Sequence, residues 1–182
     1  MVDTAVVKIR PIKLIAVIFS GITVILLISS IAGKEWVEVK FHHDNRQSIT
    51  WGLWDICEGD SCSSNTTDWV KVCATFSIVS LLFSVVVVGC GILGLCSLNV
   101  PKRKLLYVIA GGIVTLVALS DLLSLIIFPI KFRESIQTFI NVKRWDFDWT
   151  YGFGWGGFIF SVAAAVFFFL PIDDDNMESK PF

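Results

Sequence analysis

The stretch TWGLWDICEGDSC, residues 50–62, places two tryptophans and two cysteines within thirteen positions. It lies between long apolar runs that are typical of membrane spans. The role of this stretch therefore depends on how many times the chain crosses a membrane and on which side the stretch emerges.

The composition favours a membrane protein. The chain has 182 residues, of which 54% are hydrophobic and 17% charged, and its formal net charge is -1. This length predicts a single domain, and this apolar content is too high for an ordinary soluble protein. The near-neutral charge, with no basic stripe among the aromatic residues, argues against a nucleic-acid partner.

Four apolar runs are long enough to form helices that cross a bilayer, where the backbone must satisfy its own hydrogen bonds. The sequence thus predicts an all-α polytopic membrane protein. Its expected segments are an amino-terminal segment at 1–13, spans at 14–33, 72–98, 105–130 and 150–172, loops at 34–71 and 131–149, a turn at 99–104, and a tail at 173–182.

An even number of spans places both termini on the same side. Lys and Arg are nearly balanced between the two sides, but their density along the short segments favours a cytoplasmic location for the termini and the turn. The alternative for the first run is a cleavable signal peptide, since Ser30-Ile31-Ala32 loosely matches a cleavage site. The run is longer than a signal core, which favours a span.

Two features of the 34–71 loop predict that it faces outward. Asn65 begins the acceptor pattern Asn-Thr-Thr for an N-linked sugar, which is added only in the lumen. Cys57 and Cys62 could close a disulfide, which would stabilise the loop by about 2 kcal/mol on the loop-entropy model. The alternative is a pair of reduced cysteines in a flexible loop.

Short-period alternation within this loop predicts β-strands. In WVEVKF, Val37, Val39 and Phe41 share one face, while Trp36 falls on the other with Glu38 and Lys40. SITWGLW predicts a second strand with Ile49, Trp51 and Leu53 on one side, and HHDNRQ as the intervening turn. We expect further strands from the cysteine segment, and packing of Trp36, Trp51 and Trp54 on the helix ends, because two strands alone are marginal.

The combination of Trp36, Gly52-Leu53-Trp54, Cys57 and Cys62 in the first outer loop of a four-span chain resembles the W–GLW–C–C signature of the claudin superfamily. That group includes the peripheral myelin proteins, the epithelial membrane proteins and the gamma subunits of calcium channels. SSNTTDWVKVCAT, IIFPIKFRESI and FDWTYGFGWGGFIFS look similar to the branch with transmembrane protein forty-seven and the apoptosis effector related to peripheral myelin protein.

This resemblance implies a left-handed four-helix transmembrane bundle with a small extracellular antiparallel β-sheet. The commonest role in the family is adhesion or junction organisation. Only four residues separate Cys57 from Cys62, which is fewer than the family pattern and implies a shortened hairpin. The carboxyl-terminal Lys180-Pro181-Phe182 lacks the hydroxyl residue of many claudin-type PDZ ligands, so we do not expect that scaffold contact.

Asp121 is the single ionisable residue inside a predicted span. Such residues usually face the bundle interior. It either makes a structural contact with Ser120, Ser124 or a neighbouring helix, or it serves an ion or a partner. Cys96, near the cytoplasmic end of the second span, is either a candidate for palmitoylation, which claudins undergo, or a plain thiol. Cys73 and Cys90 are expected to be small packing residues.

The remaining motifs favour structure over chemistry. Gly152, Gly154, Gly156 and Gly157 predict close helix packing rather than a phosphate cradle. The adjacent His42 and His43 have no further ligands nearby, so no metal site is predicted. Nothing resembles a nucleophile with its base or a cofactor loop, and we predict a protein that is not an enzyme and needs no cofactor.

Three functions follow as hypotheses. The first is a plasma-membrane protein of cell–cell junctions that contacts membrane lipids, itself or other adhesion proteins in cis or in trans. The second is an auxiliary subunit of a channel or receptor. The third is a paracellular barrier or pore, which the mixed charges Glu38, Lys40, Asp44 and Arg46 do not favour, because they suggest no selective ring.

Overall fold

The computed structural model describes residues 11–41, 48–137 and 142–171. Within them, four helices are long and apolar enough to cross a membrane. The four-span prediction is therefore confirmed. The helices are α1 (Pro11–Ala32), α2 (Asp68–Cys96), α3 (Val100–Ile136) and α4 (Trp149–Phe169).

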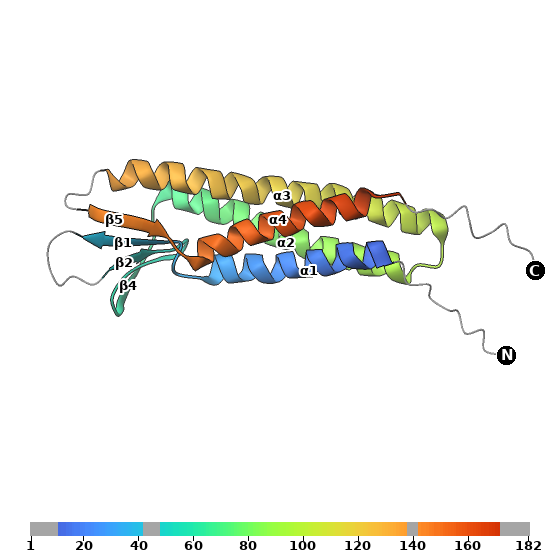
Figure 1. Cartoon of the computed structure of the whole chain (residues 1–182), viewed down its shortest axis with the longest axis horizontal. Helices are drawn as coiled ribbons and strands as arrows, with labels where there is room; N and C mark the ends of the chain where they lie inside the picture. Colours follow the sequence, from blue (N-terminus) through green and yellow to red (C-terminus); the bar gives the residue numbers. More distant parts are fainter. Residues whose placement is uncertain (1–10, 42–47, 138–141, 172–182) are drawn as a thin grey trace, which may run out of the picture.

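The helices lie side by side in an elongated bundle with the sheet at one end (Figure 1). Helix α1 packs against α2 and α4, and α3 packs against α2 and α4. The first residue of α1 and the last residue of α4 lie at the end opposite the sheet. We call these two ends the sheet end and the terminal end.

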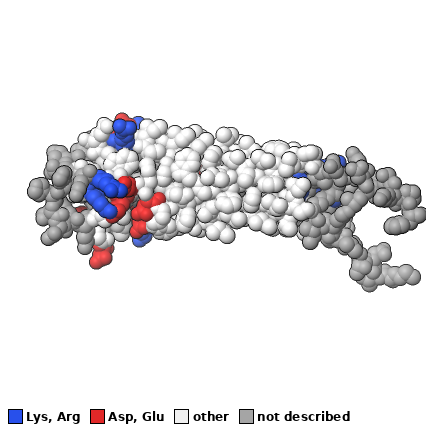
Figure 2. All heavy atoms as spheres, in the orientation of Figure 1, with Lys and Arg blue, Asp and Glu red and all other residues white. Residues whose placement is uncertain are grey.

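The bundle carries apolar side chains outward and many small polar ones inward. Large exposed residues such as Ile25 and Leu82, each more than 60% exposed, cover the middle, which Figure 2 shows free of charge on the face in view. The interior hydroxyls mostly donate to their own helix backbone, as Ser20 does to the Ala16 carbonyl. This arrangement suits hydrocarbon, because a hydroxyl that donates to its own helix backbone needs no partner from the solvent. The buried hydroxyl residues of the helices are Ser20, Thr23, Ser30, Ser77, Ser80, Ser84, Ser124, Thr150 and Ser161.

Over the residues that the structure describes, the sheet has five antiparallel strands in the order β4-β3-β2-β1-β5. Pairs such as Val39 with Ile49 and Cys57 with Cys62 set the register of neighbouring strands. The strands are β1 (Val37–Phe41), β2 (Ile49–Trp51), β3 (Asp55–Glu58), β4 (Ser61–Ser64) and β5 (Val142–Phe147). The predicted turn HHDNRQ, with His42 and His43, lies outside the described residues, as do the tail and most of the amino-terminal segment.

The alternation predicted for the first strands is present, with one difference. Val37, Val39 and Trp51 are buried against the helices. Trp36 is also buried, at 1% exposed, although the alternation placed it on the opposite face. It precedes β1, where the chain leaves α1 and turns, so strand periodicity does not apply to it. Strand β5 forms within the 131–149 segment, for which we predicted only a loop.

Helix α3 is longer than the predicted 105–130 span, since it continues through Pro129 to Ile136. Proline has no backbone N–H, so the carbonyl of Leu125, four residues earlier, loses its helical partner. The Tyr151 hydroxyl on α4 donates to this Leu125 carbonyl at 2.9 Å. A side chain from the neighbouring helix thus satisfies the acceptor that Pro129 exposes, and the helix continues.

The glycine-rich start of α4 permits close packing, as predicted, but only at some positions. A Cβ atom on Gly154 would lie 2.8 Å from a Leu125 methyl group, whereas one on Gly152 would meet nothing within 4 Å. Gly154 therefore lets α4 approach α3 beside the Tyr151–Leu125 bond.

Candidate functional site

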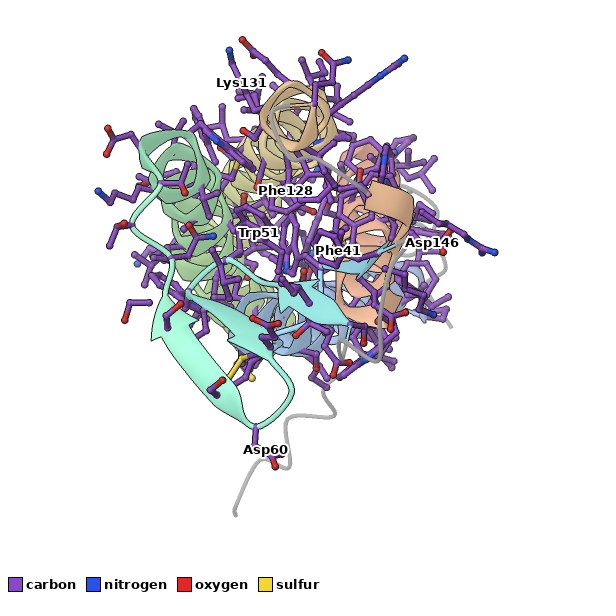
Figure 3. All side chains as sticks on the ribbon, turned by 90° about the vertical axis from the view of Figure 1, so that its left-hand side faces the viewer. Phe41, Trp51, Asp60, Phe128, Lys131 and Asp146 are labelled. Atoms are coloured by element: carbon purple, nitrogen blue, oxygen red, sulfur yellow. A yellow bond between two sulfur atoms is a disulfide. The ribbon has the colours of Figure 1, made fainter. Side chains whose placement is uncertain are left out.

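The inner face of the sheet and the adjacent helix ends share one hydrophobic core. Trp36 lies 4.7 Å from Phe128 between ring centroids, and Trp51 lies 5.5 Å from Phe132. Figure 3 shows the labelled Trp51 and Phe128 pointing toward the centre, between the strands and the helices. Aromatic burial of this kind is among the largest contributions to a core. The buried members are Trp36, Val37, Val39, Trp51, Leu53, Val70, Cys73, Ala74, Leu125, Phe128, Phe132, Ile136 and Tyr151.

Two signature tryptophans cap the carboxyl end of α1. The Trp36 indole N–H donates to the Ser30 carbonyl at 2.8 Å, and the Trp54 indole N–H donates to the Ile31 carbonyl, also at 2.8 Å. The last turn of a helix has carbonyls without helical partners, and these must be satisfied by other donors. The two indoles therefore join the sheet to the first helix by hydrogen bonds as well as by packing.

The Gly52-Leu53 pair forms a turn pressed against the segment that leaves α1. A Cβ atom on Gly52 would lie 2.8 Å from the Lys34 carbonyl oxygen, so a larger residue would displace backbone there. Leu53 is 2% exposed, whereas Trp54 is 45% exposed although its indole N–H is bonded. Gly52 thus permits a tight turn, Leu53 belongs to the core, and Trp54 caps the end of α1.

The Asn65 side chain also stabilises the Gly52-Leu53 turn by hydrogen bonding. Its Nδ2 donates to the Gly52 carbonyl at 3.2 Å, and its Oδ1 accepts from the Thr67 backbone N–H at 3.2 Å. The residue is 8% exposed. Glycosylation at Asn65 stays a prediction. A sugar would be attached to this same Nδ2, which would keep one N–H for the bond to Gly52 but would need space around a side chain that is largely buried.

The predicted disulfide between Cys57 and Cys62 is present, and it joins β3 to β4. Gly59 in the connecting turn has φ 59°, a left-handed conformation that glycine adopts without strain. All four residues of β4 are exposed. Asp60, labelled in Figure 3, marks the tip of this hairpin, which projects away from the helices.

The outer surface of the sheet end carries ion pairs of both signs. Lys40 contacts Glu38 at 2.9 Å, and hydrogen bonding by Lys40 and Ser48 lowers the pKa of Glu38. Arg144 pairs with Asp146 at 2.5 Å, which raises the pKa of Arg144. These pairs are exposed and screened by solvent, so they contribute little stability. They give the sheet end a charged, mixed surface rather than a field of one sign.

Asp121 lies inside the bundle at 3% exposed. The predicted contact with Ser124 is absent, because the Ser124 hydroxyl donates to the Cys73 carbonyl and lies 2.9 Å from the Ser77 hydroxyl. Within the described residues, the Asp121 Oδ2 has no hydrogen-bond partner. The atom faces the α4 backbone at Gly157. The structure therefore places this carboxyl at the α3–α4 contact and away from lipid.

The remaining cysteines fall in α2. Cys73 is buried, Cys90 is half-buried, and Cys96 at the last turn is exposed. Palmitoylation of Cys96 stays a prediction. Among the described residues, no group of three or more His, Cys, Asp or Glu side chains could hold a metal ion.

Sequence reasoning missed Lys13, which is 2% exposed. Its ammonium group donates to the carbonyls of Phe167, Phe168 and Leu170, at 3.0, 2.8 and 2.7 Å. Lys13 thus caps α4 from the start of α1. Its partners follow more than 150 positions later, so no local pattern could have identified this role.

Comparison with known proteins adds two findings. Residues 11–168 match the model of the PMP-22/EMP/MP20/Claudin family, so the match runs from the start of α1 almost to the end of α4. The protein "p53 apoptosis effector related to PMP-22" of Danio rerio is 29% identical over 151 residues, which are 78% of this chain and 74% of that protein.

Proposed function

Because the chain belongs to the PMP-22/EMP/MP20/Claudin family, we propose that it is a non-enzymatic plasma-membrane protein that organises cell–cell junctions through its sheet end. In this proposal the sheet is extracellular and both termini are cytoplasmic. Partners bind its outer surface in cis or in trans. The family resemblance that the W–GLW–C–C pattern indicated is shown by the match, and the fold is claudin-like.

The observation that carries the proposal is the double attachment of the sheet to the bundle. Trp36 belongs to the core shared with the helix ends, and it also caps α1 with its indole N–H. A surface fixed in this way loses little conformational entropy on binding, which favours recognition. The exposed β4 edge and the exposed pairs on β1 and β5 provide polar groups for a partner.

A second candidate function comes from the name of the Danio rerio relative, which describes an apoptosis effector. A role in death signalling would need partners that report to the cell interior. The third candidate, an auxiliary subunit of a channel or receptor, would use the exposed apolar faces of the helices. Purification of the protein from native membranes tests the third candidate, because a channel subunit would co-purify with one channel at fixed stoichiometry.

The substitution Gly59→Asn tests the proposal on the β3–β4 hairpin. It places an asparagine two residues before Ser61 and so creates a sugar-acceptor pattern at an exposed tip. Asparagine tolerates the left-handed conformation of Gly59. If the hairpin is extracellular, a glycosidase will shift the gel band of this variant relative to the parent protein. The added sugar will also reduce concentration of the protein at the lateral borders of polarised epithelial cells.

The matched control is Gly59→Asn combined with Ser61→Ala, which keeps the asparagine but removes the acceptor pattern. We expect this control to concentrate at lateral borders like the parent protein. A variant that carries the sugar and still concentrates at borders would contradict contact through the hairpin. A fully expressed variant without a sugar shift would contradict the extracellular placement.

A further inference from the structure

Two hollows adjoin at the terminal end of the bundle, between α3 and α4. The first, of about 290 Å³, is lined by Lys13, Lys104, Tyr107, Val108 and the end of α4. The second, of about 490 Å³, is a groove that continues along the outer faces of α3 and α4. Phe169, Leu170 and Pro171 line both, so they form one continuous depression with a polar end and an apolar end.

Two lysines, Lys13 and Lys104, line the polar end of the depression. Lys13 is held in place by three α4 carbonyls and lies 5.4 Å from the Tyr107 ring centroid, so its charge is fixed at the base of the hollow. Lys104 is exposed at the rim, one turn before Tyr107. Helix α3 begins at Val100, and its positive dipole end adds to the same field.

The charges of the described residues are unevenly divided between the two ends. Figure 2 shows acidic groups over the sheet end, and none over the terminal end in the part of that face that is not grey. Apart from Asp121 inside the bundle, every described acidic residue belongs to the sheet, its connections or the adjacent helix ends. Among the described residues, the charged side chains of the terminal end are therefore all basic. Its described basic residues are Lys13, Lys102, Arg103 and Lys104.

The apolar end has the form of a channel for a hydrocarbon chain. Small residues, Ala118 on α3 and Ala165 on α4, line the groove together with Val162 and Val166. From Val162 to Leu170 the groove follows α4 for about 12 Å at the helical rise per residue. This length is comparable with half of the ~30 Å hydrocarbon thickness of a bilayer. A soluble anion would occupy the first hollow but leave this groove empty.

We propose that this depression binds one anionic phospholipid, with its headgroup phosphate beside Lys104 and Lys13 and one acyl chain in the α3–α4 groove. Only a molecule that joins an anion to a long apolar chain complements both hollows. In the proposed topology the terminal end faces the cytoplasmic leaflet, where anionic lipids are concentrated. The inference concerns a lipid site on the surface of the bundle, and it rests on the proposed topology but not on the proposed role in junctions.

The test measures lipids retained by the purified full-length protein in detergent, using native mass spectrometry. Palmitoyl-oleoyl phosphatidylserine and phosphatidylcholine are added at equal concentration, so that only the headgroups differ. We expect the serine lipid to be retained about tenfold more tightly, because one net charge meets two lysines near the membrane surface. Lys104→Gln should weaken retention of phosphatidylserine about fivefold and leave that of phosphatidylcholine nearly unchanged.

Matched control variants distinguish lipid binding in this depression from nonspecific attraction of anionic lipids to a basic surface. Lys102→Gln removes another exposed charge, which lies outside the hollow, and should have little effect. Val162→Trp fills the groove and should weaken retention of both lipids, whereas Ile159→Trp, on an exposed position of α4 outside the groove, should not. Thermal unfolding in detergent identifies any variant that fails to fold.

Four results would overturn the proposal. Equal retention of the two lipids would exclude headgroup recognition, and equal losses in the Lys102 and Lys104 variants would indicate a diffuse basic surface. Full retention by Val162→Trp would exclude the groove. The acidic residues Asp173, Asp174 and Asp175 follow Pro171 in the sequence. If a preference for phosphatidylserine is measured only after these three aspartates are changed to Asn, the chain's own tail, and not a lipid, occupies the depression.

Discussion

At the scale of single residues, the signature tryptophans are explained by hydrogen bonding as much as by hydrophobic burial. Trp36 and Trp54 donate to consecutive carbonyls at the end of α1, but Trp36 does so in the buried core and Trp54 at a partly exposed site. An unpaired polar group costs free energy in proportion to its isolation from water. The indole hydrogen bond of Trp36 should therefore contribute more to the free energy of unfolding than that of Trp54.

The substitution of each tryptophan by phenylalanine tests this difference. Trp36→Phe leaves the buried Ser30 carbonyl without its donor and should lower the free energy of unfolding by about 1–3 kcal/mol. Trp54→Phe should cost clearly less, since water can reach the Ile31 carbonyl. Denaturant unfolding in one detergent, followed by helical circular dichroism, measures both. Equal costs would show that loss of ring packing, rather than the missing hydrogen bond, dominates.

At the scale of elements, the sequence predicted well where a local pattern is enough. Apolar run length predicted the four helices, and the alternation of Val37, Val39 and Trp51 predicted β1 and β2. We expected further strands from the cysteine segment, and the family resemblance implied the antiparallel sheet and a shortened hairpin between Cys57 and Cys62, which is the β3–β4 hairpin. These features are encoded by neighbouring residues, so they need no knowledge of the tertiary structure.

Features that depend on distant partners were not predictable in the same way. Strand β5 forms because β1 offers it a free edge, as in the pairing of Val39 with Trp145. The chain between Pro129 and Ile136 stays helical because Tyr151 on another helix satisfies Leu125. The predicted span ended at residue 130, next to Pro129, but α3 continues because of a contact that the sequence does not display.

The Pro129–Tyr151 relation predicts a measurable coupling between two helices. Tyr151→Phe should destabilise the protein by about 1–3 kcal/mol, because the Leu125 carbonyl is buried and loses its donor. In a Pro129→Ala background the alanine N–H can bond to Leu125, so the same Tyr151→Phe change should cost less. A double-mutant cycle on unfolding free energies measures the coupling, expected at about 0.5–3 kcal/mol. Strict additivity would mean that the tyrosine hydroxyl does not compensate for the proline.

At the scale of the whole molecule, the sheet and the bundle form one folded unit joined at a shared core. Residues of β1 and β2 lie in the same cluster as Phe128 and Phe132 of α3. Strand β4, by contrast, is exposed and contacts the rest of the sheet through β3 alone. The free energy of local unfolding increases with the number of buried contacts that a segment makes. The β1 side of the sheet should therefore be stable, and the β4 side should unfold locally more easily.

Hydrogen exchange measured by mass spectrometry tests this gradient across the molecule. We expect the backbone amides of β1 to exchange as slowly as those of α3 around Phe128, and those of β4 to exchange much faster. Trp36→Phe should accelerate β1 and the last turn of α1 together, since one side chain holds both. If β1 instead opens while the neighbouring helix ends stay protected, the sheet is a separate module. It could then not present a partner with the fixed surface on which the proposed function rests.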